Sequence, residues 1–167
     1  MPCLSRVTRE NSSDLANYAQ EFADAKETGF VLPRNDPEHF LSRVERFETG
    51  ENLPPDRVRM SWFWLLEGDR ILASSRLRHQ LIPILLLDGG NIGYDVRPSE
   101  RGRGVGREVL RLTLDEARLI GLRRALLTTE TTNEASIRVI LANGGVLSDT
   151  SVSPNTGKIM NRYWVAL

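Results

Sequence analysis

The sequence predicts a mixed α/β fold of the α+β kind, with a central, twisted and mostly antiparallel sheet of six to seven strands and helices on both faces. Three observations favour this class. Two helical patterns lie near the N-terminus, a strand hairpin follows them, and the second half alternates strand and helix before two closing strands. We expect a single domain over residues 1–167, because this length suffices for one hydrophobic core.

The first half of the chain predicts one strand, then two helices, then a hairpin of two strands. Their positions are a strand over 4–8, a helix over 15–25 that Gly29 ends, a helix that Asn35 or Asp36 caps and Gly50 ends, and a hairpin of 57–67 with 70–79 around Gly68-Asp69. Residues 80–90 are apolar but contain Pro83, which is unfavourable inside a strand, so a loop or short helix is expected there.

The second half predicts a strand over 91–96 and then regular alternation. The further elements are a helix over 105–120 that Gly121 ends, a strand over 124–129, a helix over 133–143, and strands over 146–151 and 158–166. The organising feature is the glycine-rich turn between the strand ending at Val96 and the helix beginning at Val105.

Composition excludes several classes of protein. Lysine plus arginine and aspartate plus glutamate both total 22, and this balance argues against a general nucleic-acid or anionic-membrane binder. No apolar run approaches the ~20 residues that span a bilayer, and the N-terminus lacks the apolar core of a signal peptide. Cys3 is the only cysteine, so we expect no internal disulfide, no metal site and a cytoplasmic location.

The glycine-rich turn has the properties of an anion site. The first turn of a helix has backbone N–H groups without intrahelical partners, and the helix dipole adds partial positive charge. Glycines let a phosphate approach the backbone, and neighbouring arginines add full charges. The predicted cofactor-binding residues of this turn are Val96, Arg101, Gly102, Arg103, Gly104, Val105, Gly106 and Arg107.

Two common phosphate motifs do not match this turn. The Walker motif requires Lys and then Ser or Thr after the last glycine, but Arg107 and Glu108 follow Gly106. A dinucleotide fingerprint beginning at Gly102 would require a glycine at position 107. A surface turn with arginines around it, or a site for nucleotide phosphates, stays as the alternative.

The stretch from Arg101 to Gly106 resembles the Arg/Gln-x-x-Gly-x-Gly/Ala signature of the GNAT superfamily of N-acetyltransferases. Val96-Arg97-Pro98 is similar to the end of that family's fourth strand, and Asn133-Glu134-Ala135-Ser136 to its Asn-x-x-Ser helix. The resemblance extends from about residue 91 to 146. It implies the GNAT fold, acetyl-coenzyme A as co-substrate on the turn amides, and Asn133 and Ser136 beside the coenzyme arm.

Two positions depart from the family pattern. Many relatives have a tyrosine four residues after the helix serine, near the sulfur, and Ile140 occupies that place here. Gly145 stands where the family has a phenylalanine. Because isoleucine cannot donate a proton, we consider Tyr94, His79 and Tyr163 as the replacement acid, or exchange with water.

The general base is also open. Glu130 follows a buried strand close to the expected acetyl group, and His79 has a side chain that titrates near neutrality. The structural alternatives are that Glu130 is a helix-capping or solvated carboxylate and that His79 is a surface histidine. Asp95, within the strand before the turn, could bind an acceptor amine or could be an ordinary hydrogen-bonded carboxylate.

The resemblance implies an N-acetyltransferase that moves an acetyl group directly from acetyl-coenzyme A to a primary amine. The acceptor is a small molecule or a peptide, and a homodimer is a further expectation. A longer acyl donor or an alcohol acceptor is the rival among enzymes. The rival outside them is a coenzyme A-binding sensor without transfer activity, which the loss of the family tyrosine at Ile140 favours.

Overall fold

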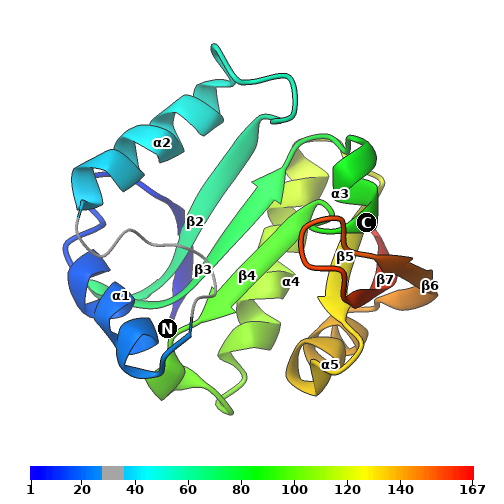
Figure 1. The fold of residues 1–167 in the computed structure, drawn as a ribbon. Helices are drawn as coiled ribbons and strands as arrows, with labels where there is room; N and C mark the ends of the chain where they lie inside the picture. The colour runs from blue at the N-terminus through cyan, green and yellow to red at the C-terminus, as the bar shows by residue number, and fades with distance from the viewer. Residues whose placement is uncertain (28–35) are drawn as a thin grey trace.

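The structure is a computed structural model that describes residues 1–27 and 36–167. In these residues seven strands form two antiparallel sheets, of order β1-β2-β3-β4 and β5-β7-β6 (Figure 1). The elements are β1 (Cys3–Arg6), α1 (Leu15–Asp24), α2 (Pro37–Thr49), β2 (Met60–Glu67), β3 (Arg70–Arg78), α3 (Pro83–Leu87), β4 (Ile92–Val96), the 3₁₀ turn η1 (Pro98–Glu100), α4 (Val105–Leu119), β5 (Arg124–Glu130), α5 (Glu134–Ala142), β6 (Val146–Val152) and β7 (Ile159–Ala166).

Among the described residues, hydrogen bonds join the two sheets just before the start of β4 and at the middle of β5. The Asn91 N–H donates to the Leu126 carbonyl oxygen at 2.7 Å, and the Leu126 N–H donates to Asn91 Oδ1 at 2.9 Å. Gly90 permits this approach, since a Cβ there would lie 2.3 Å from the Leu126 oxygen. Beyond this junction β4 and β5 diverge, and β4 keeps hydrogen-bonded pairing only with β3 (Figure 1).

Helices cover both faces of the first sheet. On one face α1 and α2 pack their apolar sides against β2, in a cluster built around Tyr18, Phe40, Trp62 and Trp64. On the other face α4 contributes Leu110 and Leu114 to the main core, which continues through β5, α5 and β7. The main core therefore packs against the side of β4 that carries Ile92 and Tyr94, and among the described residues one edge of that strand has no paired strand.

The predicted fold class is confirmed, with one refinement: the seven strands divide into two sheets instead of forming one continuous sheet. The strand expected from residue 57 begins at Met60, and residues 83–87 form the short helix α3. Asp36 caps α2 by accepting from the His39 N–H at 2.8 Å. Gly29 and Asn35, the other proposed helix end and cap, lie outside the described residues.

No helix within residues 1–27 and 36–167 has the length and apolar character that crossing a bilayer requires.

Candidate active site

The glycine-rich turn connects β4 to α4 and has the backbone geometry that its sequence indicates. Gly102 and Gly104 have φ angles of +74° and +83°, a region that disfavours residues with a side chain. A Cβ at either position would meet no atom within 4 Å, so the space above the turn is open. Gly106, the second residue of α4, packs against Val96 and Val139, where a Cβ would lie 3.3–3.4 Å from their methyl groups.

The turn presents a row of free donors. Among the hydrogen bonds of the described residues, none uses the backbone N–H groups of residues 102–107. These groups stand at the N-terminus of α4, a helix of 15 residues, where the helix dipole favours an anion. They border a cavity of about 570 Å³ whose wall also includes Arg101, Arg107 and Arg138. This combination suits a phosphate or diphosphate group.

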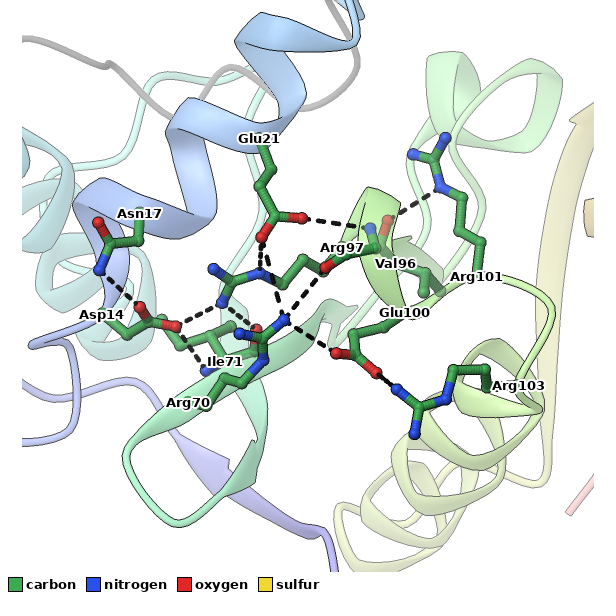
Figure 2. A network of polar contacts seen from close by, with 11 residues as sticks. Asp14, Asn17, Glu21, Arg70, Ile71, Val96, Arg97, Glu100, Arg101 and Arg103 are labelled. Atoms are coloured by element: carbon green, nitrogen blue, oxygen red, sulfur yellow. Dashed lines mark hydrogen bonds and ion pairs between the residues drawn. The ribbon is translucent and has the colours of Figure 1, made fainter.

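A polar network holds the turn in place (Figure 2). Arg97, at the end of β4, is 3% exposed and donates to Asp14 at 2.5 Å, to Glu21 at 2.6 Å and to the Ile71 carbonyl at 3.0 Å. Glu21 also accepts from the Ser99 N–H at 3.2 Å. The network therefore fixes α1 against the residues that enter the turn.

Glu100 forms the second half of this network. Its carboxylate is largely buried and accepts from Arg70 at 2.9 Å and from Arg103 at 2.6 Å. Arg103 therefore points toward this carboxylate and is not part of the cavity wall, whereas Arg101 lines the cavity and makes a bidentate ion pair with Glu27 at 2.5 and 2.7 Å.

The open edge of β4 faces the same cavity. The Arg97 N–H donates to the Leu72 carbonyl of β3, so alternate residues of β4 direct their N–H and C=O groups toward β3. By this alternation the N–H and C=O groups of Tyr94 and Val96 point away from β3, toward the edge of β4 that does not pair with β5. The Val96 carbonyl accordingly accepts from Arg101 Nε at 3.2 Å.

A second cavity, of about 640 Å³, lies on the other side of the divergence between β4 and β5. Its wall includes side chains from α2, β2, β3, α3 and β5. The two cavities share three wall residues, Tyr94, Asn133 and Ser136. The shared residues form the boundary at which a group in one cavity can reach a group in the other.

Tyr94 and Ser136 are in contact at this boundary. The Tyr94 hydroxyl lies 3.1 Å from Ser136 Oγ, and it connects β4 to the first turn of α5. Asn133 caps α5 by accepting from the Ser136 N–H at 3.1 Å. Burial, the largest influence, raises the pKa of Tyr94 to about 12, so that the phenol stays protonated at physiological pH.

Comparison with known proteins identifies the family. The family model described as an acetyltransferase (GNAT) domain matches residues 3–146. The chain belongs to the GNAT acetyltransferase family. Among curated proteins, none matches the sequence.

Solved structures of GNAT acetyltransferases share the fold at low identity. Ribosomal-protein-S5-alanine acetyltransferase from Vibrio fischeri is 16% identical, with a TM-score of 0.75 over 98% of this chain and 91% of that one. A putative acetyltransferase, yncA, from Salmonella typhimurium, solved with its cofactor acetyl-CoA, is 16% identical, with a TM-score of 0.69 over 99% and 94%. RimJ from Mycobacterium smegmatis, in complex with CoA-disulfide, is 15% identical, with a TM-score of 0.75 over 98% and 80%.

The two departures from the GNAT pattern lie in contact. Ile140 is 1% exposed and belongs to the main core. A Cβ at position 145 would lie 2.4 Å from Ile140 Cγ2 and 2.9 Å from its carbonyl oxygen, so the backbone there leaves room only for glycine. Isoleucine in place of the family tyrosine and glycine in place of the family phenylalanine therefore form one packing arrangement, which the sequence alone did not reveal.

The candidate bases and acids lie in different environments in this GNAT fold. Glu130 lines the larger cavity and forms an ion pair with Lys158 at 2.8 Å. His79 lines neither cavity; it contacts Ser61 Oγ at 2.8 Å through Nε2, and burial together with Arg59 lowers its pKa. Tyr163 is buried in the main core and accepts from Asn161 at 3.3 Å. Of these candidates, Tyr94 lies at the boundary and Glu130 lines the larger cavity.

A buried ion pair that the sequence did not indicate lies beside the boundary. Asp95 points to the α1/α2 face of β4, where it pairs with Arg76 at 3.4 Å and accepts from Ser74 Oγ at 3.3 Å. The Arg76 guanidinium crosses β4 at Gly93, since a Cβ there would lie 2.8 Å from its terminal nitrogen. Burial raises the pKa of Asp95 although Arg76 opposes the shift. Asp95 lies on β4 and Arg76 on β3, so the register between these two strands brings them together, and local sequence does not specify that register.

Proposed function

We propose that this GNAT protein transfers an acetyl group directly from acetyl-coenzyme A to a primary amine. The observation that carries the proposal is the meeting of two cavities at Tyr94, Asn133 and Ser136. One cavity has the free N–H groups of an anion site, and the other is wide enough for an acceptor. A donor and an acceptor bound in the two cavities would meet at this boundary, and positioning alone supplies much of the rate of such reactions.

The residues of the smaller cavity fit a coenzyme A diphosphate. The unused N–H groups of residues 102–107 would hold the phosphate oxygens, and Arg107 would balance part of their charge beside Arg101, which Glu27 already pairs. The free edge of β4 at Tyr94 and Val96 would orient an extended pantetheine arm by backbone hydrogen bonds and polarise a carbonyl group. When bound, acetyl-coenzyme A supplies the activated thioester, whose carbon–sulfur bond breaks as the bond to nitrogen forms.

Two side chains would transfer the protons. The acceptor amine has to lose a proton, and we assign Glu130, which lines the acceptor cavity, as the base that accepts it. The departing sulfur has to gain one, and the Tyr94 hydroxyl, with Ser136 beside it, is the donor at the boundary. The Tyr94 pKa of about 12 keeps the phenol protonated, so its deprotonation should produce no falling limb in the pH–rate profile below about pH 10.

Replacing Gly104 with valine should abolish most coenzyme A binding while the protein stays folded. Valine would strain the backbone at a φ of +83° and place methyl groups in the open space above the turn. In the unmodified protein, coenzyme A at a hundredfold excess over its Kd should add about 2.7 kcal/mol of stability, which thermal unfolding measures. Gly121→Val is the matched control, because Gly121 has a φ of +87°, similar open space and a position at the far end of α4. Equal stabilisation of Gly104→Val and Gly121→Val by coenzyme A would show that the turn does not bind the coenzyme.

Replacing Glu130 with glutamine should lower kcat/KM by ~10² to 10⁴, the usual effect of losing a general base. Glu134→Gln is the control: Glu134 is a solvent-exposed carboxylate on the first turn of α5 and pairs with Arg138. Rates at saturating acetyl-coenzyme A should separate the two variants. If Glu130→Gln matches the control, and the rising limb of the pH profile follows only the pKa of each acceptor, the amine loses its proton without Glu130.

Release of the coenzyme A thiol from acetyl-coenzyme A, measured with a panel of primary amines, tests the proposed function. We expect thiol release that depends on an amine, together with the acetylated amine as product. Binding of coenzyme A without turnover of any amine would favour the alternative of a coenzyme A-binding sensor. Stronger binding of adenosine diphosphate than of coenzyme A would favour a nucleotide site.

We further propose a homodimer formed through the edge strand β6. This strand ends the second sheet, none of its residues is buried, and it exposes Val146, Leu147 and Val152 to solvent. An unpaired apolar edge of this kind favours pairing with another chain. A monomer mass by light scattering at micromolar concentration would reject the dimer.

A further inference from the structure

The larger cavity combines an apolar wall with several charges, and both features bear on the acceptor. Phe47 from α2, Met60 and Trp62 from β2, and Ile84 and Leu85 from α3 supply the apolar part. The ionisable side chains of the wall are four arginines and three carboxylates: Arg43, Arg57, Arg76, Arg78, Asp56, Asp88 and Glu130. Which of these charges is balanced decides what kind of group the cavity favours.

The three wall carboxylates already have partners. Asp56 lies 3.9 Å from Arg57, and Glu130 pairs with Lys158 at 2.8 Å. Asp88 accepts from Ser153 Oγ at 2.5 Å. Asp88 also lies close enough to Arg78 to oppose the decrease that burial causes in the pKa of that guanidinium.

Two of the remaining arginines have partners within the protein. Arg78 donates to the carbonyl oxygens of Gly89 and Gly90 at 2.9 and 3.1 Å. Arg76 pairs with Asp95, which belongs to the other cavity wall. Both guanidinium groups therefore have a carboxylate nearby, Asp88 for Arg78 and Asp95 for Arg76.

Arg43 is the exception. It lies on α2 one turn before Phe47, so both side chains extend from the same face of the helix into the cavity wall. Within residues 1–27 and 36–167 it takes part in no ion pair or hydrogen bond, and it is half-buried. Residues 28–35 contain Arg34 but no aspartate or glutamate, so their sequence offers Arg43 no carboxylate.

We propose that the acceptor is an amino carboxylic acid whose carboxylate pairs with Arg43. A guanidinium binds a carboxylate through two parallel hydrogen bonds, and an unmatched one in a cavity wall favours an anionic ligand over a cationic one. The apolar wall between Arg43 and the boundary at Tyr94 accommodates the carbon skeleton, and the amine then reaches Tyr94 and Ser136. This inference rests on the proposed transfer function, because it names the substrate of the same site.

Matched acceptor pairs test the inference. The ω-amino acids from glycine to aminohexanoic acid are compared with alkylamines of the same carbon number, and phenylalanine with phenethylamine, at saturating acetyl-coenzyme A. We expect the best amino acid to exceed its amine in kcat/KM by about 10- to 100-fold, the size of one charge-assisted contact. The chain length at the maximum reports the separation between Arg43 and the transfer point.

Variants of Arg43 provide the second arm. Arg43→Gln should remove the preference by raising KM for the amino acids, with kcat and the rates of the plain amines nearly unchanged. Arg43→Lys, which keeps the charge without the bidentate geometry, should restore part of the preference. Arg46→Gln is the matched control on the same helix, since Arg46 is exposed, donates to the Asn52 carbonyl and lines neither cavity.

The outcomes separate this inference from the proposed function. The inference would be overturned if plain amines had the same kcat/KM as their amino acids, or if a cationic polyamine were preferred. It would also be overturned if Arg43→Gln lowered the rates with amines and amino acids equally. Each of these results would leave acetyl transfer intact. If no member of the panel is acetylated, both proposals are overturned.

Discussion

Tyr94→Phe is expected to lower kcat by ~10² to 10⁴ while acetyl-coenzyme A still binds. The substitution removes only the hydroxyl that lies 3.1 Å from Ser136 Oγ at the meeting point of the two cavities. The aromatic ring remains and keeps its packing against the core beside α4. The departing sulfur then loses the proton donor that we assign to it, and Ile140, at the position of the family tyrosine, cannot replace that donor.

The measurement compares steady-state kcat with coenzyme A binding for each variant. Tyr163→Phe is the control, because Tyr163 is a buried tyrosine of the same core whose hydroxyl contacts Asn161 and lines neither cavity. Ser136→Ala should show a smaller loss, since water can occupy the place of its hydroxyl. A Tyr94→Phe enzyme with the kcat of the Tyr163→Phe control would mean that the sulfur is protonated by solvent.

Gly90→Ala is expected to cost more stability than any other glycine-to-alanine change at a turn within residues 1–27 and 36–167, about 3 kcal/mol or more. An added Cβ would lie 2.3 Å from the Leu126 carbonyl oxygen and 2.8 Å from its carbon, and both are backbone atoms that cannot rotate away. Gly90 also has a φ of +56°. The junction between β4 and β5 would have to separate, and with it the hydrogen bonds between Asn91 and Leu126.

Gly68→Ala isolates the contribution of the backbone angle. Gly68 has a φ of +58°, almost the same as Gly90, but a Cβ there would meet nothing within 4 Å. Its loss should amount to only the ~1–2 kcal/mol of left-handed strain. Urea unfolding of both variants gives the difference, and insoluble or unfolded Gly90→Ala protein beside folded Gly68→Ala protein would agree with the prediction. Equal losses would show that the two sheets can move apart at Gly90 without penalty.

The parts of the site that depend on local sequence were predictable. The turn at Gly102 and Gly104 has its character because a strand, glycines and a helix follow one another directly, and the structure has each element there. The Asn133 cap is local as well, since its acceptor and the Ser136 N–H are three residues apart. Periodicity predicted the elements because each amphipathic face is buried against its neighbour.

The parts that depend on distant segments were not predictable. Asp14 occupies the N-cap position of α1, but its carboxylate makes no capping hydrogen bond; it accepts from the Ile71 N–H and from Arg97, residues 57 and 83 positions away. Arginine side chains are usually exposed, so the burial of Arg97 has no sequence signal. The location of His79 outside both cavities and the pairing of Arg76 with Asp95 likewise depend on strand register and on the divergence of β4 from β5.

Initial rates over a matrix of acetyl-coenzyme A and amine concentrations test whether both substrates are bound when the acetyl group is transferred. Because the donor and acceptor cavities meet at Tyr94, both substrates should be bound together when the acetyl group moves. Direct transfer therefore predicts double-reciprocal lines that intersect, with no acetyl group left on the protein. Parallel lines with an acetylated protein would indicate a covalent enzyme intermediate, and with it a different use of these two cavities.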